Sequence, residues 1–81
     1  MREIRLRRAE IRQRAATLSP RERAIVSLVV AGLLNKQIGD RLNLALVTVK
    51  VHRGRAMRKL GARSAADLAH LALSAGITCQ Y

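Results

Sequence analysis

Aromatic and acidic residues are scarce in this chain. Of its 81 residues none is Phe or Trp, Tyr81 is the only aromatic one, and five are Asp or Glu. Domains that read unstacked RNA bases usually stack them on aromatic side chains. The scarcity of aromatic residues therefore counts against one candidate function, that of an RNA- or ribosome-associated basic protein. The few carboxylates form no pair on one helix face, and no phosphate-cradling loop is present. The sequence therefore predicts no catalytic residues and no enzyme.

Cysteine and long apolar runs are also lacking. Cys79 is the only cysteine, so an intrachain disulfide is excluded, and His52 and His70 lie too far apart for metal-ligand spacing. We expect a free thiol, no metal and no cofactor. No run of 18 apolar residues exists, and no apolar segment follows the Arg-rich stretch after Met1. We therefore expect a soluble, cytoplasmic protein without a membrane partner.

Basic residues, by contrast, are abundant. Sixteen Lys and Arg give a net charge of +11, and residues 48–63 hold six of these cations and no acid. Such a charge predicts a polyanionic partner, and nucleic acid is favoured over a membrane surface because no long apolar anchor accompanies it. The length allows one small domain with a thin core.

Capping signals divide the chain into helices. Ser19-Pro20-Arg21-Glu22 places Ser at the N-cap, Pro at the first helical position and Glu where it closes a capping box. Gly32 and Gly61 are expected to end helices, and Ser64 to cap the last one. We predict an all-α fold with four helices near residues 20–31, 35–42, 46–60 and 64–75, the second capped by Asn35.

A less anchored helix is expected before these four. Residues 3–17 contain neither Gly nor Pro, and their apolar line is narrow, consisting of Ile4, Ile11, Ala15 and Leu18. We interpret residues 1–17 as a basic helical linker, in preference to a segment that contacts phosphates. Residues 18–77 would form the domain and 78–81 a tail.

The second and third predicted helices are joined by a turn of about four residues, which is typical of a helix-turn-helix. In the helix 46–60, Val49, Ala56 and Leu60 share one face, with His52 and Met57 at its edges. The opposite face contains Lys50, Val51, Gly54, Arg55 and Arg58. Such a face suits the major groove: cations reach guanine edges or phosphates, Val meets a thymine methyl, and Gly allows close approach. For an isolated basic helix a solvated face is the commoner interpretation, but the helix-turn-helix pattern favours the groove.

Four separated motifs carry a family resemblance: Leu18-Ser-Pro-Arg-Glu-Arg, Val30-Ala-Gly-Leu-Leu-Asn-Lys-Gln-Ile, Thr48-Val-Lys-Val-His-Arg and Met57-Arg-Lys-Leu-Gly-Ala-Arg-Ser. Together they closely resemble the LuxR/FixJ-type DNA-binding domain over about residues 18–77. The Arg-rich helix before them and the ending Ala72-Leu-Ser-Ala-Gly-Ile point to the FixJ branch of response regulators.

The resemblance implies a compact four-helix module that binds double-stranded DNA as a dimer, regulates transcription and serves a two-component response regulator. The receiver domain of such a regulator is absent from this chain, and RNA polymerase is a candidate partner. By resemblance, Lys50, Val51 and Arg55 lie nearest the bases, and His52 packs against the domain. The residues expected on phosphates are Lys36, Thr48 and Arg53.

The sequence departs from the family pattern at the start of the groove helix. Ala45, Leu46 and Val47 stand where relatives commonly have Ser and polar residues. The missing hydroxyl cap should cost about 1 kcal/mol, and Leu46 and Val47 cannot reproduce a polar phosphate contact. Gly39 replaces the usual Ala of the second helix, at a cost of up to about 1 kcal/mol in helix propensity.

The last predicted helix is almost entirely apolar. From Ala65 to Ala75 the polar residues are Asp67, His70 and Ser74, which form one narrow stripe. One helix on a small core does not need so wide an apolar surface, so we expect it to meet a second subunit. The residues predicted to dimerise are Ala65, Leu68, Ala69 and Ala72.

Overall fold

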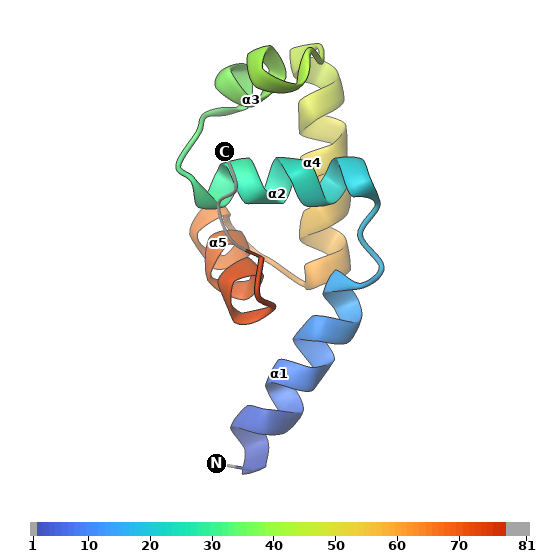
Figure 1. Cartoon of the computed structure of the whole chain (residues 1–81), viewed down its shortest axis with the longest axis vertical. Coiled ribbons are helices and arrows are strands. Elements are labelled where there is room, and N and C mark those ends of the chain that lie inside the picture. The colour runs from blue at the N-terminus through green and yellow to red at the C-terminus, as the bar shows by residue number, and fades with distance from the viewer. Residues whose placement is uncertain (1, 78–81) are drawn as a thin grey trace.

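The computed structural model describes residues 2–77, with side chains from Arg7 onward. It contains the helices α1 (Arg2–Ala15), α2 (Pro20–Val30), α3 (Asn35–Leu42), α4 (Leu46–Leu60) and α5 (Ala65–Ser74), and no strand within that range (Figure 1). The predicted all-α class is confirmed. The predicted tail 78–81, with Cys79 and Tyr81, lies outside the described residues, as does the side chain of Ile4. None of the helices in residues 2–77 is both long and apolar enough to span a membrane.

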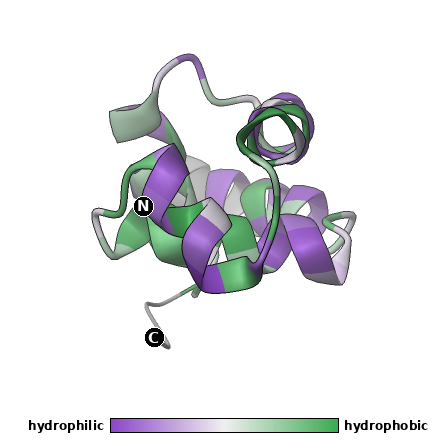
Figure 2. Cartoon of the chain, turned by 90° about the horizontal axis from the view of Figure 1, so that it is seen from above, coloured by the Kyte–Doolittle hydropathy of each residue, from purple (hydrophilic) through white to green (hydrophobic). Residues whose placement is uncertain are grey.

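The core lies where α2 crosses α4 and packs against α5 (Figure 1). Its α4 side is the stripe predicted from the sequence, because Val49, Ala56 and Leu60 are all buried. Both hydrophobic and hydrophilic residues occur around the helices in the view of Figure 2. The other elements contribute the buried side chains Ala15, Ile25, Val26, Leu28, Val29, Ile38, Leu68, Ala72 and Ile77.

Local capping fixes the helix starts. In the capping box of α2, Glu22 N–H donates to Ser19 Oγ at 3.1 Å and Ser19 N–H donates to Glu22 Oε1 at 2.8 Å. The predicted cap of α3 is wrong: the N-cap is Leu34, whose N–H donates to Gln37 Oε1 at 2.8 Å. Asn35 is already inside the helix, and its side chain is used by Arg53 instead.

The corner between α3 and α4 is tighter than an alanine at position 39 would allow. Asn43 has a φ of 57°, and Leu44 N–H donates to the Gly39 carbonyl at 2.8 Å. A Cβ at Gly39 would lie 2.7 Å from the Leu44 carbonyl oxygen. Gly39 therefore costs helix propensity, as predicted, but it also lets the two helices of the motif close on each other.

Helix α1 extends from the body of the molecule and gives it its long dimension of 42 Å, against 20 and 19 Å across (Figure 1). It is anchored through its C-terminal half, where Ala15 is buried and Ile11 is half-buried. The guanidinium of Arg14 lies against Gly61, at the end of α4, and would have to shift if a Cβ were present there. The predicted helix before the domain is thus present and contacts both α4 and α5.

Candidate nucleic-acid interface

One side of α4 points directly away from the core. Val47, Val51, Gly54 and Arg58 follow each other at spacings of four, three and four residues, which stacks them on one helix face opposite the buried stripe. The side chain of Val47 is 67% exposed. The cations Lys50 and Arg55 flank this row, and both are exposed. The structure therefore brings the five predicted base-facing residues together on one surface, with Val47 as a sixth member.

The basic residues of α4 fall into two groups. Within the described part of the chain, Lys50, Arg55 and Arg58 have no ion-pair partner and are exposed. Arg53 and Lys59 instead bind polar groups of other elements. Fewer positive charges are thus available to a ligand than the count of basic residues suggests.

Arg53 fastens α3 to α4. Its Nη1 donates to Asn35 Oδ1 at 2.5 Å, and the residue is half-buried. An arginine has five N–H donors, so this bond leaves others free, and a phosphate contact by Arg53 stays a prediction. The bond itself links the start of α3 to the middle of α4.

The other predicted phosphate ligands lie at helix starts. Lys36 is exposed in the first turn of α3, and Thr48 is half-buried in the first turn of α4. Ala45 is the N-cap of α4 and offers no side-chain cap, as expected from the missing serine. Lys36 and Thr48 therefore lie on the two helices of the helix-turn-helix motif, and their contacts with phosphates stay a prediction.

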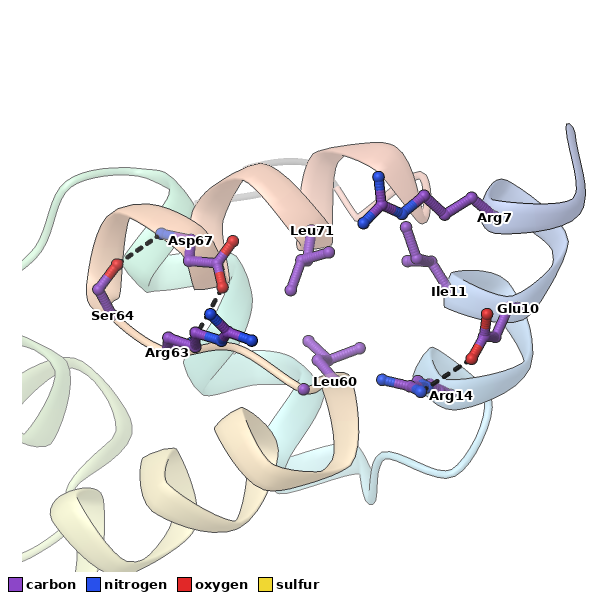
Figure 3. Close-up of a pocket in the computed structure, with 10 residues that line it drawn as sticks. Arg7, Glu10, Ile11, Arg14, Leu60, Arg63, Ser64, Asp67 and Leu71 are labelled. Carbon is purple, nitrogen blue, oxygen red and sulfur yellow. Dashed lines mark hydrogen bonds and ion pairs between the residues drawn. The ribbon is translucent and has the colours of Figure 1, made fainter. Parts of the chain in front are cut away.

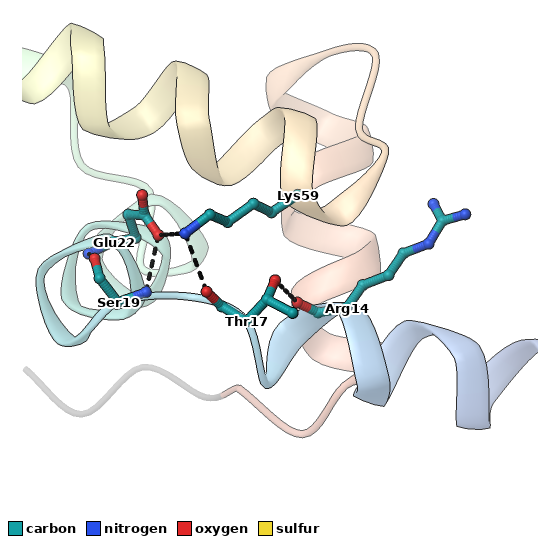
Figure 4. A network of polar contacts seen from close by, with 5 residues as sticks. All are labelled: Arg14, Thr17, Ser19, Glu22 and Lys59. Atoms are coloured by element: carbon teal, nitrogen blue, oxygen red, sulfur yellow. Dashed lines mark hydrogen bonds and ion pairs between the residues drawn. The ribbon is translucent and has the colours of Figure 1, made fainter.

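A polar network holds the C-terminal end of α4 (Figure 4). Lys59 Nζ donates to Glu22 Oε1 at 2.6 Å and to the Thr17 carbonyl at 3.0 Å. Glu22 is only 3% exposed. The hydrogen bond from Lys59, followed by that from the Ser19 N–H, lowers the pKa of Glu22 despite its burial. Because 37 residues separate Glu22 from Lys59, no sequence spacing could have paired them.

His52 lies at the edge of the core, as the helical pattern predicts. It is half-buried, and its Nδ1 is buried without a hydrogen-bond partner among the described residues. The imidazole packs against the domain and is not part of the exposed face of α4.

The predicted dimer surface on α5 needs correction. Leu68 and Ala72 are fully buried in the core, so their side chains are not available to a second subunit. Ala65 is exposed and Ala69 half-buried. Leu73, which the sequence analysis left out, is 56% exposed. Spaced four residues apart, Ala65, Ala69 and Leu73 form an apolar row that α5 presents to solvent, with the exposed Ala66 beside it.

A groove of about 610 Å³ is lined by residues of α1, of the end of α4 and of α5 (Figure 3). Its two carboxylates are used locally: Glu10 Oε1 accepts from Arg14 at 2.8 Å, and Asp67 Oδ2 accepts from the Arg63 N–H at 2.9 Å. Among the side chains that the structure describes, those of residues 7–77, no cluster of three His, Cys, Asp or Glu could hold a metal. The lining of the groove is mainly polar and includes Arg7, and its apolar part consists of Ile11, Leu60 and Leu71.

Comparisons with known proteins agree with this geometry. Residues 16–72 match the family described as "Bacterial regulatory proteins, luxR family". Nodulation protein W of Bradyrhizobium diazoefficiens is 45% identical over 73 residues, which are 90% of this chain and 32% of that protein. Transcriptional regulatory protein FixJ of Rhizobium meliloti is 48% identical over 67 residues, which are 83% of this chain and 33% of that protein.

Solved structures give the same result. A structure of the response regulator StyR matches with a TM-score of 0.82 at 43% identity, over 89% of this chain and 36% of that one. Full-length FixJ from B. japonicum matches with a TM-score of 0.78 at 36% identity, over 91% of this chain and 36% of that one. The chain thus spans about a third of the length of each of these relatives.

Proposed function

The chain belongs to the LuxR family of bacterial regulatory proteins, and we propose from this premise that it is the output domain of a two-component response regulator. It is a LuxR-type helix-turn-helix DNA-binding domain that serves transcription regulation. The family is one of transcription regulators and not of enzymes.

The observation that carries the proposed mechanism is the exposed face of α4. Helix α4 would enter the major groove with Lys50, Val51, Arg55 and Arg58 toward base edges, because guanidinium and ammonium groups match the guanine acceptors there. There is room beside Gly54, because the nearest atom to an added Cβ would be Arg58 Nη1 at 3.7 Å. With no side chain there, the helix backbone would come close to the DNA.

Phosphate contacts would fix the register of this helix on the duplex. We propose that Lys36 from α3 and Thr48 from α4 make such contacts, since both lie in the first turn of their helix, with Arg53 as a third candidate. Phosphate contacts add affinity for any sequence, whereas contacts from α4 to base edges add preference for one.

Pairing of two domains would double the number of base pairs that are read. We propose that two copies meet through α5, along the exposed row of Ala65, Ala69 and Leu73. Two alanines and one leucine from each copy bury well under the roughly 1,200 Å² of a stable complex, so pairing should be weak without DNA.

The longer relatives leave room for a receiver domain, and we propose that one controls this domain in the full-length protein. RNA polymerase is proposed as a partner at the promoter and the cytoplasm as the location, because a regulator of transcription works where the chromosome lies.

Selection of bound sites from a random duplex library tests the proposed function. We expect enrichment of a motif with two half-sites, whose centres lie one helical turn of about 10 base pairs apart, or a multiple of it. Failure to enrich any sequence, or equal binding of single-stranded RNA in competition, would contradict sequence-specific duplex binding.

A further inference from the structure

Exposed apolar side chains cluster at the start of α4. Of the five large hydrophobic side chains that are exposed in the described residues, three lie within six residues, and these are Leu46, Val47 and Val51. Single exposed hydrophobic residues are ordinary, but a cluster at a binding surface indicates contact with a ligand. Val47 and Val51 belong to the row that points directly away from the core.

The first turn of α4 is also free of charge. Residues 46–49 carry none, and the cations of the helix begin at Lys50. In a helix-turn-helix, the N-terminal residues of the second helix contact base edges. The part of α4 that would reach deepest into the groove is therefore uncharged, and its exposed side chains Leu46 and Val47 are apolar.

A major groove offers one apolar feature to such a surface, the C5-methyl group of a pyrimidine. An aliphatic side chain against an unmethylated edge would bury donors and acceptors without partners, which is unfavourable. Thymine carries this methyl group, and so does 5-methylcytosine. The chemistry of Val47 and Val51 thus selects for methylated pyrimidines and against bare polar edges.

The geometry allows both valines to read at once. Residues four apart on a helix lie about 6 Å apart along its axis, which corresponds to roughly two base-pair steps of 3.4 Å. A β-branched side chain on a helix has one strongly preferred rotamer, so each valine presents its methyl groups in a fixed direction. Gly54 on the next turn of the same row removes the side chain that would hold the helix away.

From these observations we propose that Val47 is a specificity-determining residue and that Val47 and Val51 together read pyrimidine C5-methyl groups in the major groove. Val47 would thus gain a contact with bases at a position where a polar contact with phosphate is lost. This inference rests on the proposed function, because it requires α4 to lie in the groove.

The test uses the whole chain and its selected duplex in matched forms. Replacing thymine by uracil under α4 keeps every hydrogen bond and removes only methyl groups. From the value of one buried methyl group we expect affinity to fall roughly fourfold for each methyl that is read. Placing cytosine and then 5-methylcytosine at the same positions separates the methyl group from the rest of the thymine ring, and methylation should restore affinity.

Two variants assign the effect to a side chain. Val47→Ser should lower affinity for the thymine duplex and reduce the thymine-to-uracil ratio of affinities by roughly the same fourfold. Leu34→Ser is the matched control, because Leu34 is 70% exposed but lies at the start of α3, off this face. It should leave the ratio unchanged. Val47 is exposed, so Val47→Ser should retain the wild-type melting temperature. Leu34→Ser places a hydroxyl at the N-cap of α3 and should retain or raise it.

Each of the following outcomes would overturn a different part of the proposal. Equal affinity for thymine and uracil duplexes, or an enriched motif without thymine under α4, would overturn methyl reading while leaving duplex binding intact. A ratio that persists in Val47→Ser would remove Val47 from the reading surface. Unchanged DNA binding in Val47→Ser would assign this apolar surface to a protein contact instead. Absence of any duplex binding would overturn the proposed function itself.

Discussion

Replacing Lys59 by Met should destabilise the domain, because it leaves the buried carboxylate of Glu22 with only one of its two donors. Met keeps the length of the aliphatic stem, so packing changes little. A hydrogen bond to a charged group contributes about 1.5–3 kcal/mol. The Lys59 side chain is 37% exposed, so water can partly replace it, and we expect a loss of about 1–2 kcal/mol. In a domain of this size that corresponds to a decrease in melting temperature of about 5–15 °C.

Urea unfolding of a double-mutant cycle measures this contact. Glu22→Gln, Lys59→Met and the double variant should show a coupling free energy of about 1 kcal/mol at neutral pH, because the two side chains are in direct contact. Strict additivity, or a Lys59→Met variant as stable as the wild type, would refute this explanation of how the end of α4 is held.

The pH dependence provides a second readout of the same pair. The folded pKa of Glu22 is lowered, first by Lys59 and then by the Ser19 N–H, relative to an unfolded value of about 4.3. The resulting stabilisation is complete above the unfolded pKa and is lost as the pH falls through the folded pKa, since the unfolded chain then takes up a proton first. The stability advantage over Glu22→Gln should shrink in acid, and a constant difference from pH 7 to pH 3 would contradict it.

Three further substitutions follow from burial and contacts. Leu68→Ala should lower the free energy of unfolding by about 2–5 kcal/mol in thermal or urea melts, because Leu68 is fully buried in the core. Leu73→Asp should leave stability nearly unchanged but abolish cooperative occupancy of two half-sites in a gel-shift titration, since it places a charge in the proposed contact. Asn35→Ala should cost about 0.5–1.5 kcal/mol by removing the bond to Arg53, and should weaken DNA binding measured by anisotropy.

Local features were predictable because local interactions decide them. The capping box at Ser19 and Glu22 acts over three residues, and the buried stripe of Val49, Ala56 and Leu60 follows from helical periodicity alone. The helix boundaries from residue 20 on therefore agree with the prediction to within one residue at each end.

Tertiary contacts set the limit of what could be predicted from the sequence. Asn35 satisfies the rules for an N-cap, yet it pairs with Arg53, 18 residues away, and Leu34 takes the cap position. Lys59 counts toward the basic segment by composition, but its charge is used on Glu22 inside the domain. Composition counts charges, whereas only the packed structure shows which of them remain free for a ligand.

The roles of side chains in α5 and at the start of α4 were hard to predict for a different reason. Where nearly the whole circumference of a helix is apolar, periodicity cannot distinguish the core from a partner surface, so Leu68 and Ala72 were assigned to the wrong side. Val47 was interpreted as a lost phosphate contact, because an exposed valine has no obvious role in a sequence pattern. Val47 can be assigned to the row of residues on α4 that points away from the core only when the buried residues are known.

The most direct measurement of the central claim, that the exposed face of α4 reads base pairs, is affinity on selected and random duplexes over a range of salt concentrations. We expect Arg55→Ala to cost about 1–3 kcal/mol on the selected duplex and much less on random DNA. Lys36→Ala should weaken both alike and reduce the salt slope by about one unit. If Arg55→Ala instead weakened both duplexes equally, Arg55 would be contacting only the backbone, and reading of bases by α4 would be wrong.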